Sequence, residues 1–181
     1  MNQDFLAVVE TKRFLGREFL TWLAWRLEDE GGRIQLGDDV VQLALGDRLA
    51  LRERAANGGR ITLVDPGDMR PELGAALRRG KLLDRARISV QRGDRKWELS
   101  LDGGLLTYDS LRCPPLGPRD PAPGDDARAH FENDFFLRLA DVEDVVGVLD
   151  RLFKAFCETR AANSWETTTL PAMRSWIAEL A

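Results

Sequence analysis

The sequence predicts an α+β protein in which antiparallel β meanders are flanked by helices. Three segments predict this fold class: an apolar run with helical spacing at residues 14–27, short alternating segments over residues 40–108, and a second helical apolar stripe at residues 142–156. Hydrophobic residues make up 44% of the 181 residues and charged residues 31%. This is an ordinary globular composition, so we expect the chain to bury a core.

The first helix is predicted at residues 14–27, where apolar side chains occupy nearly every side. Leu15, Phe19, Leu23 and Leu27 follow one another at a spacing of four. Trp22 and Trp25 widen the apolar face. Core packing is a more common role than base stacking for aromatic residues on such a helix, so we interpret both tryptophans as core residues.

Three short segments then alternate in the manner of antiparallel strands: Val40–Leu45, Arg48–Arg54 and Arg60–Val64. Gly46-Asp47 and residues 57–59 separate them, which predicts hairpin turns. A short helix is predicted at residues 71–80, because proline is tolerated in a first turn and glycine commonly ends a helix.

Two further hairpins are predicted from their own side-chain pattern. A two-residue turn at Gly93-Asp94 pairs Ala86 with Leu101, Ile88 with Leu99 and Val90 with Trp97, which places these apolar residues on one side. A second turn at Gly103-Gly104 pairs Leu101 with Leu106 and Leu99 with Tyr108 on that same side. The result is a three-stranded meander with one apolar face.

Residues 113–128 are rich in proline and predict a linker or an extended surface loop. They divide the chain into a helix and sheet region at residues 1–112 and a C-terminal strand and helix region at residues 129–181, which we expect to pack on the same core. In the C-terminal region, Asp134–Leu139 has the pattern of a strand and Asp141 that of an N-cap opening a helix to about Arg160. A single longer helix from Phe131 is the alternative. The residues of this helix expected to face the core are Val142, Val145, Val146, Leu149, Leu152, Phe153 and Phe156.

The chain closes with a helix predicted from Pro171 onward. Met173, Trp176, Ile177 and Leu180 line one side of it. The helix docks either on its own core, which is common for terminal helices, or onto a partner protein.

Several classes of protein are disfavoured by composition. No apolar stretch is long enough for a membrane helix, and the N-terminus lacks the layout of a secretion signal, so we expect a cytoplasmic protein without membrane contact. Cys113 and Cys157 belong to no metal or redox spacing and are expected to be free thiols. The net charge of −4 means that any nucleic-acid site must be local.

The sequence contains no recognisable catalytic centre. The single histidine, His130, has no serine or cysteine motif that would pair with it. Acidic pairs such as Asp38-Asp39 and Asp125-Asp126 lack calcium-loop spacing, and no phosphate-binding, dinucleotide-binding or zinc-protease motif is present. We therefore expect a binding protein with no enzymatic activity, metal or cofactor.

Charge is unevenly distributed along the chain. Residues 78–96 carry eight cations against two aspartates, and residues 120–150 carry nine acids against two arginines. The predicted hairpin projects Arg85, Arg87 and Lys96 away from the apolar face, where guanidinium groups suit phosphate oxygens. Alternatively, the cations form a solvated face or pair with the acidic half, within the fold or across a dimer.

Residues 71–114 resemble the family of the recombination-associated protein RdgC: a short helix, a glycine-lysine pair, an outer strand, a hairpin and a Leu-Asp-Gly-Gly-Leu turn into the next strand. Residues 131–156 are similar to that family's C-terminal strand and helix, and residues 14–23 look like a run in shorter RdgC-like proteins. Over half of the chain is covered, and it corresponds mainly to the C-terminal half of a family member.

This resemblance implies a nucleoid-associated protein that binds DNA without sequence preference, forms a ring-like dimer around duplex DNA and restrains RecA-driven recombination. It implies backbone contacts from the basic residues of the matching stretch: Arg78, Arg79, Lys81, Arg85 and Arg87. With Lys96 added from the hairpin register, these are the predicted DNA-binding residues. We expect a homodimer. The alternative function is a non-enzymatic scaffold or subunit whose basic face binds an acidic protein and whose C-terminal helix is buried in the partner.

Overall fold

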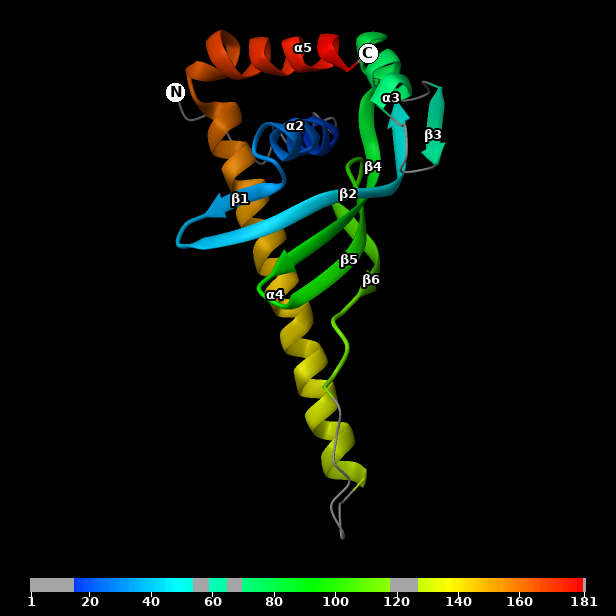
Figure 1. Ribbon diagram of the computed structural model, residues 1–181, viewed down its shortest axis with the longest axis vertical. Helices are drawn as coiled ribbons and strands as arrows, with labels where there is room; N and C mark the ends of the chain where they lie inside the picture. Colours follow the sequence, from blue (N-terminus) through cyan, green and yellow to red (C-terminus); the bar gives the residue numbers. More distant parts are fainter. Residues whose placement is uncertain (1–14, 54–58, 65–69, 118–126, 181) are drawn as a thin grey trace.

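The computed structural model describes residues 15–53, 59–64, 70–117 and 127–180. Figure 1 shows a sheet with helices packed around one end and one long helix running past it. The strands are β1 (Arg33–Leu36), β2 (Asp39–Arg52), β3 (Arg60–Val64), β4 (Leu82–Arg92), β5 (Arg95–Asp102) and β6 (Thr107–Arg112). The helices are α2 (Leu15–Asp29), α3 (Arg70–Arg78), α4 (Ala127–Ala161), the π-helical turn η1 (Trp165–Thr169) and α5 (Leu170–Glu179). The predicted α+β class is confirmed.

The described strands form one antiparallel sheet in the order β1-β2-β4-β5-β6, and β3 also pairs with β2. The inner face of this sheet packs against α2, whose residues Phe19, Trp22 and Leu23 are buried. Trp22 therefore belongs to the core as predicted, and Trp25 is half-buried against it. Among the described residues, no helix is both long and apolar enough to cross a membrane. Both cysteines are free, as predicted.

The predicted hairpin at Gly46-Asp47 is wrong, because β2 runs through these residues as one strand. One edge of β2 pairs with β4 from Gln42 to Arg52, and the other edge pairs first with β1 and then with β3. The turn signal instead marks a bulge: Leu45 lies opposite Ile88 and Leu49 opposite Ala86. Glycine suits this position, because a Cβ atom on Gly46 would lie 3.1 Å from Cγ of Arg87. Strand β1 was missed.

The hairpin at Gly93-Asp94 has the predicted register, in which Val90 lies opposite Trp97, Ile88 opposite Leu99 and Ala86 opposite Leu101. The next hairpin was predicted in the wrong register, because Leu101 pairs with Tyr108 and not with Leu106. Two contacts explain why the turn differs from the one predicted at Gly103-Gly104. The Asp102 carboxylate accepts hydrogen bonds from the backbone N–H groups of Gly104 and Leu105, and Gly103 packs directly against Gly16 of α2.

The C-terminal region contains one continuous helix, α4, so the alternative prediction of a single helix is confirmed and the strand at Asp134–Leu139 is wrong. Asp141 lies within α4 and forms ion pairs with Arg95 and Arg138, so it is not an N-cap. The helix keeps apolar residues in register from Phe131 onward, and this periodicity outweighs the local strand pattern. Residues 118–126 of the predicted linker lie outside the described residues.

The apolar stripe predicted for α4 divides into two faces. Val145, Leu152 and Phe156 are buried in the core, together with Val148. Val142, Val146, Leu149 and Phe153 are only half-buried. The helix therefore presents more apolar surface than its own core covers.

Helix α5 docks on the same chain. Met173, Trp176 and Leu180 are buried, and the Trp176 indole donates a hydrogen bond of 2.8 Å to Glu28 of α2. The predicted apolar side of this helix is therefore occupied by its own core and is not an exposed surface for a partner.

Candidate nucleic-acid interface

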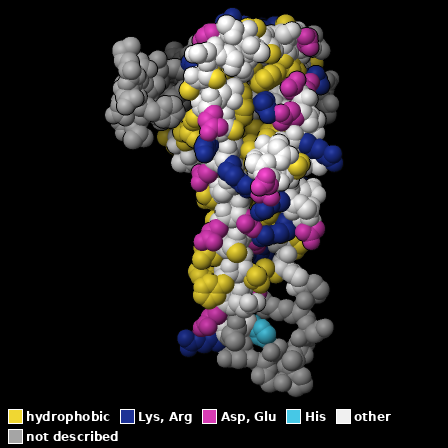
Figure 2. All heavy atoms as spheres, turned by 90° about the vertical axis from the view of Figure 1, so that its left-hand side faces the viewer, with side chains coloured by type: hydrophobic (Ala, Val, Ile, Leu, Met, Phe, Trp, Pro, Cys, Tyr) yellow, Lys and Arg dark blue, Asp and Glu magenta, His cyan; other side chains and the backbone are white. Residues whose placement is uncertain are grey.

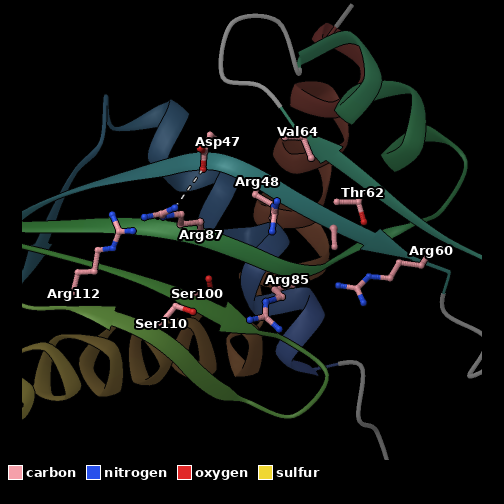
Figure 3. A pocket seen from close by; sticks show the side chains of 11 residues that line it. Asp47, Arg48, Arg60, Thr62, Val64, Arg85, Arg87, Ser100, Ser110 and Arg112 are labelled. Atoms are coloured by element: carbon pink, nitrogen blue, oxygen red, sulfur yellow. Dashed lines mark ion pairs between the residues drawn. The ribbon is translucent and has the colours of Figure 1, made fainter.

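The outer face of the sheet carries arginines from four strands. In β4, Arg85 and Arg87 alternate with the buried residues Ala86 and Ile88, so their side chains leave the sheet on the side away from α2. Strand β2 contributes Arg48, β3 contributes Arg60 and β6 contributes Arg112. Figure 3 shows these side chains on one side of the strands. Pairing between non-consecutive strands thus gathers charges that are up to 64 positions apart in the chain.

These arginines line an open hollow of about 700 Å³. The other lining residues are Asp47, Ala50, Thr62, Val64, Ser100 and Ser110. Five guanidinium groups against one carboxylate make the lining strongly cationic. Hydroxyl groups of Thr62 and the two serines add neutral hydrogen-bond donors, so the surface suits ligands with many anionic oxygen atoms.

The five arginines differ in their ion pairs. Arg48 and Arg60 are exposed and form no ion pair with any residue in the described ranges. Arg85 pairs with Asp109, and Arg87 pairs with Glu98 at 2.9 Å. An external anion could therefore reach the guanidinium groups of Arg48 and Arg60 without breaking any ion pair of the described residues.

Glu98 is shared by three cations of this face. Its carboxylate lies 2.9 Å from Arg87, 3.1 Å from Lys96 and 3.7 Å from Arg112. The hydrogen bond from Lys96 and then that from Arg87 lower the pKa of Glu98 below its usual value. A second, smaller hollow of about 390 Å³ includes Lys96 next to Arg87 and Arg112, so Lys96 extends the cationic surface.

The outer face of the sheet carries six cations in and around the two hollows, and three carboxylates pair with some of them. The cations are Arg48, Arg60, Arg85, Arg87, Lys96 and Arg112, and the carboxylates are Asp47, Glu98 and Asp109. The formal excess is three positive charges. We call this set of six cations the arginine face. It is a local positive field on a chain whose net charge is −4.

Of the six DNA-binding residues predicted from the sequence, the structure brings Arg85, Arg87 and Lys96 together on the arginine face. Arg78 instead donates hydrogen bonds of 3.2 and 3.3 Å to the carbonyl oxygens of Ile177 and Leu180. Arg79 is exposed beyond the end of α3 and lines neither hollow.

Lys81, the sixth predicted residue, is buried. Its Nζ atom bonds to Glu53 at 2.9 Å and to the carbonyl oxygen of Gly59 at 3.0 Å. The hydrogen bond from Lys81 lowers the pKa of Glu53. Lys81 therefore binds Glu53, just after β2, and Gly59, just before β3, and its charge is directed to these internal partners.

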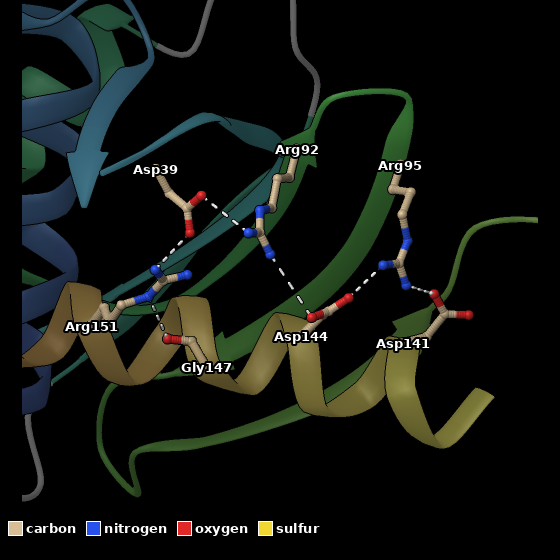
Figure 4. Close-up of polar contacts among 7 residues, drawn as sticks. All are labelled: Asp39, Arg92, Arg95, Asp141, Asp144, Gly147 and Arg151. Carbon is tan, nitrogen blue, oxygen red and sulfur yellow. Dashed lines mark hydrogen bonds and ion pairs between the residues drawn. The ribbon is translucent and has the colours of Figure 1, made fainter. Parts of the chain in front are cut away.

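At the far end of the β4–β5 hairpin, the arginines pair with the acidic helix α4. Arg95 pairs with Asp141 and Asp144, and Arg92 lies 3.0 Å from Asp39 and 3.9 Å from Asp144. Figure 4 shows this network, which Arg151 extends through a 2.8 Å contact with Asp39. We call Asp39, Arg92, Arg95, Asp141, Asp144 and Arg151 the ionic seam. Figure 2 shows the corresponding mixture of positive and negative side chains along this side of the molecule. Among the described residues, Arg92 and Arg95 therefore pair with the acidic half, whereas Arg85 and Arg87 pair with Asp109, Asp47 and Glu98 of the sheet.

Sequence reasoning missed Arg48, Arg60 and Arg112. The available signal was their alternation with apolar neighbours, as in Arg48-Leu49 and Arg60-Ile61, which places them on the polar side of their strands. Few other basic residues lie near them in the sequence, so a search for segments dense in lysine and arginine does not find them.

The arginine face offers charged and neutral hydrogen-bond donors to an anionic ligand. Within the described ranges, no group of three or more histidine, cysteine, aspartate or glutamate side chains could hold a metal ion. The thiols of Cys113 and Cys157 have pKa values raised chiefly by burial, which favours the protonated, unreactive form. The chain matches no family model and no curated protein.

Proposed function

We propose that the arginine face binds the phosphate backbone of duplex DNA without reading its sequence. The observation that carries this proposal is that Arg48 and Arg60, which form no ion pair within the described ranges, line the same hollow as Arg85, Arg87 and Arg112. Guanidinium groups bind phosphate oxygens through two parallel hydrogen bonds, and backbone contacts carry no sequence information.

The shape of the face supports a backbone contact over base reading. The described part of the face presents strands and no helix that could enter a major groove. Its lining contains no aromatic side chain on which an unpaired base could stack. We therefore propose that the arginine face contacts DNA through electrostatic interactions with its phosphate groups.

The resemblance of residues 71–114 and 131–156 to RdgC supports the same function and adds a biological setting. In that setting the protein is a cytoplasmic, nucleoid-associated factor that modulates recombination. The proposal differs from the sequence prediction in its contacts: Arg48, Arg60 and Arg112 join Arg85, Arg87 and Lys96, while Arg78, Arg79 and Lys81 are left out.

A salt titration with a short duplex tests the proposal. The logarithm of the binding constant should fall linearly with the logarithm of salt concentration, with a slope of about −0.9 per phosphate neutralised. The double variant Arg48→Ala/Arg60→Ala should lower the magnitude of this slope by about 2, because two phosphate contacts are lost. Arg79→Ala is the matched control, since this arginine is exposed but lies outside the hollow.

If the wild-type protein does not bind the duplex even at low salt, DNA binding is ruled out. If the face then bound an acidic polypeptide such as polyglutamate, and lost it in Arg48→Ala/Arg60→Ala, the alternative function as a scaffold for an acidic protein would take its place.

A further inference from the structure

Helix α4 carries a second apolar stripe that its own core leaves partly uncovered. The stripe consists of Phe135, Leu139, Val142, Val146, Leu149 and Phe153. Phe135 and Leu139 are 56% and 44% exposed, and the other four are half-buried. Figure 2 shows hydrophobic side chains along this part of the helix, and Figure 1 shows α4 extending past the strands. An exposed stripe of this kind marks an interaction surface.

The spacing of the stripe is that of a coiled-coil seam. Successive members are separated by four, three, four, three and four positions, which is the alternation of the a and d sites of a heptad. The core-facing residues Val145, Val148, Leu152 and Phe156 form a separate row. The stripe therefore fits a second helix lying beside α4, next to the row that already packs on the sheet.

The identity of the second helix follows from the order of the side chains. Read from Phe135 to Phe153, the stripe is Phe, Leu, Val, Val, Leu, Phe, and its spacing is the same in both directions about residue 144. If two copies of α4 pack antiparallel about a two-fold axis at this position, Phe135 meets Phe153, Leu139 meets Leu149 and Val142 meets Val146. Each layer joins an a site to a d site with matched side-chain types, and the surface is complementary to itself.

We infer that two copies of this chain associate through an antiparallel pairing of their α4 helices about Asp144. The projecting first turns of one α4 then cover the half-buried Leu149 and Phe153 of the other. Phe136, 64% exposed beside the stripe, widens the apolar contact. The inference specifies the interface of the homodimer expected from the sequence, and it does not depend on DNA binding by the arginine face.

Glu143 offers a test of the two-fold symmetry of the proposed dimer. Glu143 is exposed on the flank of the stripe, one position from the proposed axis, so the two Glu143 carboxylates of a dimer face each other. Like charges at such a distance oppose association. Replacement by glutamine should tighten the dimer several-fold, an effect with no counterpart in the stability of a single chain.

Sedimentation equilibrium of the full chain, from about 1 to 100 μM, tests the interface. Wild-type protein should dimerise, and Leu139→Glu should raise the dissociation constant roughly a hundredfold, because it places a charge in two layers of the seam. Leu137→Glu is the matched control: Leu137 is 46% exposed and lies on the other side of the helix. It should dimerise like the wild type.

A monomeric wild-type protein at 100 μM would overturn the inference. A dimer that survives Leu139→Glu, or that Leu137→Glu breaks equally, would do the same. Far-ultraviolet circular dichroism checks that each variant is folded, which we expect because both leucines lie on the projecting part of α4.

Spin labels test the antiparallel orientation. A label at Lys154→Cys, in a background with Cys113→Ser and Cys157→Ser, should give a separation along the helix axis of about 30 Å, because the two sites lie 20 residues apart at 1.5 Å per residue. A parallel, in-register pair would instead hold the labels about 10 Å apart, and that result would contradict the proposal.

Discussion

The arginine face and the ionic seam each include two arginines of the β4–β5 hairpin, but the guanidinium groups of the two regions have different partners. In the ionic seam, Arg92 and Arg95 are engaged by the carboxylates of Asp39, Asp141 and Asp144. On the arginine face, Arg48 and Arg60 have no carboxylate partner in the described residues. The ionic seam links α4 to the sheet, whereas the arginine face holds two guanidinium groups that have no ion pair within the described ranges.

The difference shows that a dense run of basic residues in the sequence is a poor guide to which cations lack a carboxylate partner among the described residues. Residues 78–96 hold the densest positive charge of the chain, but Lys81, Arg92 and Arg95 are committed to internal contacts. What separates the two regions is the position of acidic side chains brought in from distant segments. Mutations in each region can test this difference, because duplex affinity and folding stability should respond separately in the two regions.

The largest effect is expected from charge reversal on the arginine face. Arg48→Glu/Arg60→Glu should weaken duplex binding about a hundredfold at moderate salt, because two phosphate contacts become repulsive. Its midpoint of thermal unfolding should stay close to that of the wild type, since neither arginine has an ion-pair partner to lose in the part of the chain that the structure describes. Fluorescence anisotropy and differential scanning calorimetry measure the two quantities. Equal losses of both would show that these arginines are structural.

Arg95→Ala should have the opposite profile. It leaves the buried carboxylate of Asp141 with Arg138 as its remaining charged partner, so the free energy of unfolding should fall by about 1–2 kcal/mol. Duplex affinity should be unchanged. Urea denaturation gives the stability, and Arg79→Ala serves as the control for loss of an exposed arginine. A variant as stable as the wild type would mean that the ionic seam contributes little.

The pH dependence of stability sharpens the comparison at Asp39. The hydrogen bond from Arg151, and then that from Arg92, hold the pKa of Asp39 below its usual value of 3.8. A depressed folded-state pKa adds stability above the unfolded-state value and loses it as pH falls. Asp39→Asn should therefore be less stable than the wild type by a constant amount near neutrality, and the gap should close below about pH 4. Urea midpoints across pH measure it, with Asp38→Asn as the control.

The smallest effect is expected at Glu98, which partly neutralises Arg87, Lys96 and Arg112. Glu98→Gln should strengthen duplex binding by roughly three- to tenfold, because it adds one net positive charge to the arginine face. The gain should shrink as salt is raised. A loss of affinity would indicate that Glu98 positions these cations and that their order matters more than their net charge.

The sequence predicted those parts of the fold that rest on local alternation. The Gly93-Asp94 hairpin follows from its own side-chain pattern, and this register correctly turned Arg85 and Arg87 away from the core. Gly46-Asp47 has the composition of a turn but forms a bulge, because β2 pairs with β4 on both sides of these two residues. Local residue preference cannot anticipate a partner strand that lies 40 positions away.

The candidate site was half predictable for the same reason. Arg85, Arg87 and Lys96 share a hairpin, so their common face could be derived from one register. Arg48, Arg60 and Arg112 join them through the β2–β3, β2–β4 and β5–β6 pairings, two of which were not foreseen in their observed form. The burial of Lys81 depends on Glu53 and Gly59, whose approach no sequence pattern signals.

Arginine-selective labelling with phenylglyoxal, read by mass spectrometry with and without saturating duplex DNA, tests most directly which region binds. Arg48 and Arg60 should react readily in the free protein and become protected in the complex, while Arg92 and Arg95 should react slowly in both. Protection that appears at Arg92 and Arg95, or that is missing at Arg48 and Arg60, would contradict the assignment of the binding surface to the arginine face.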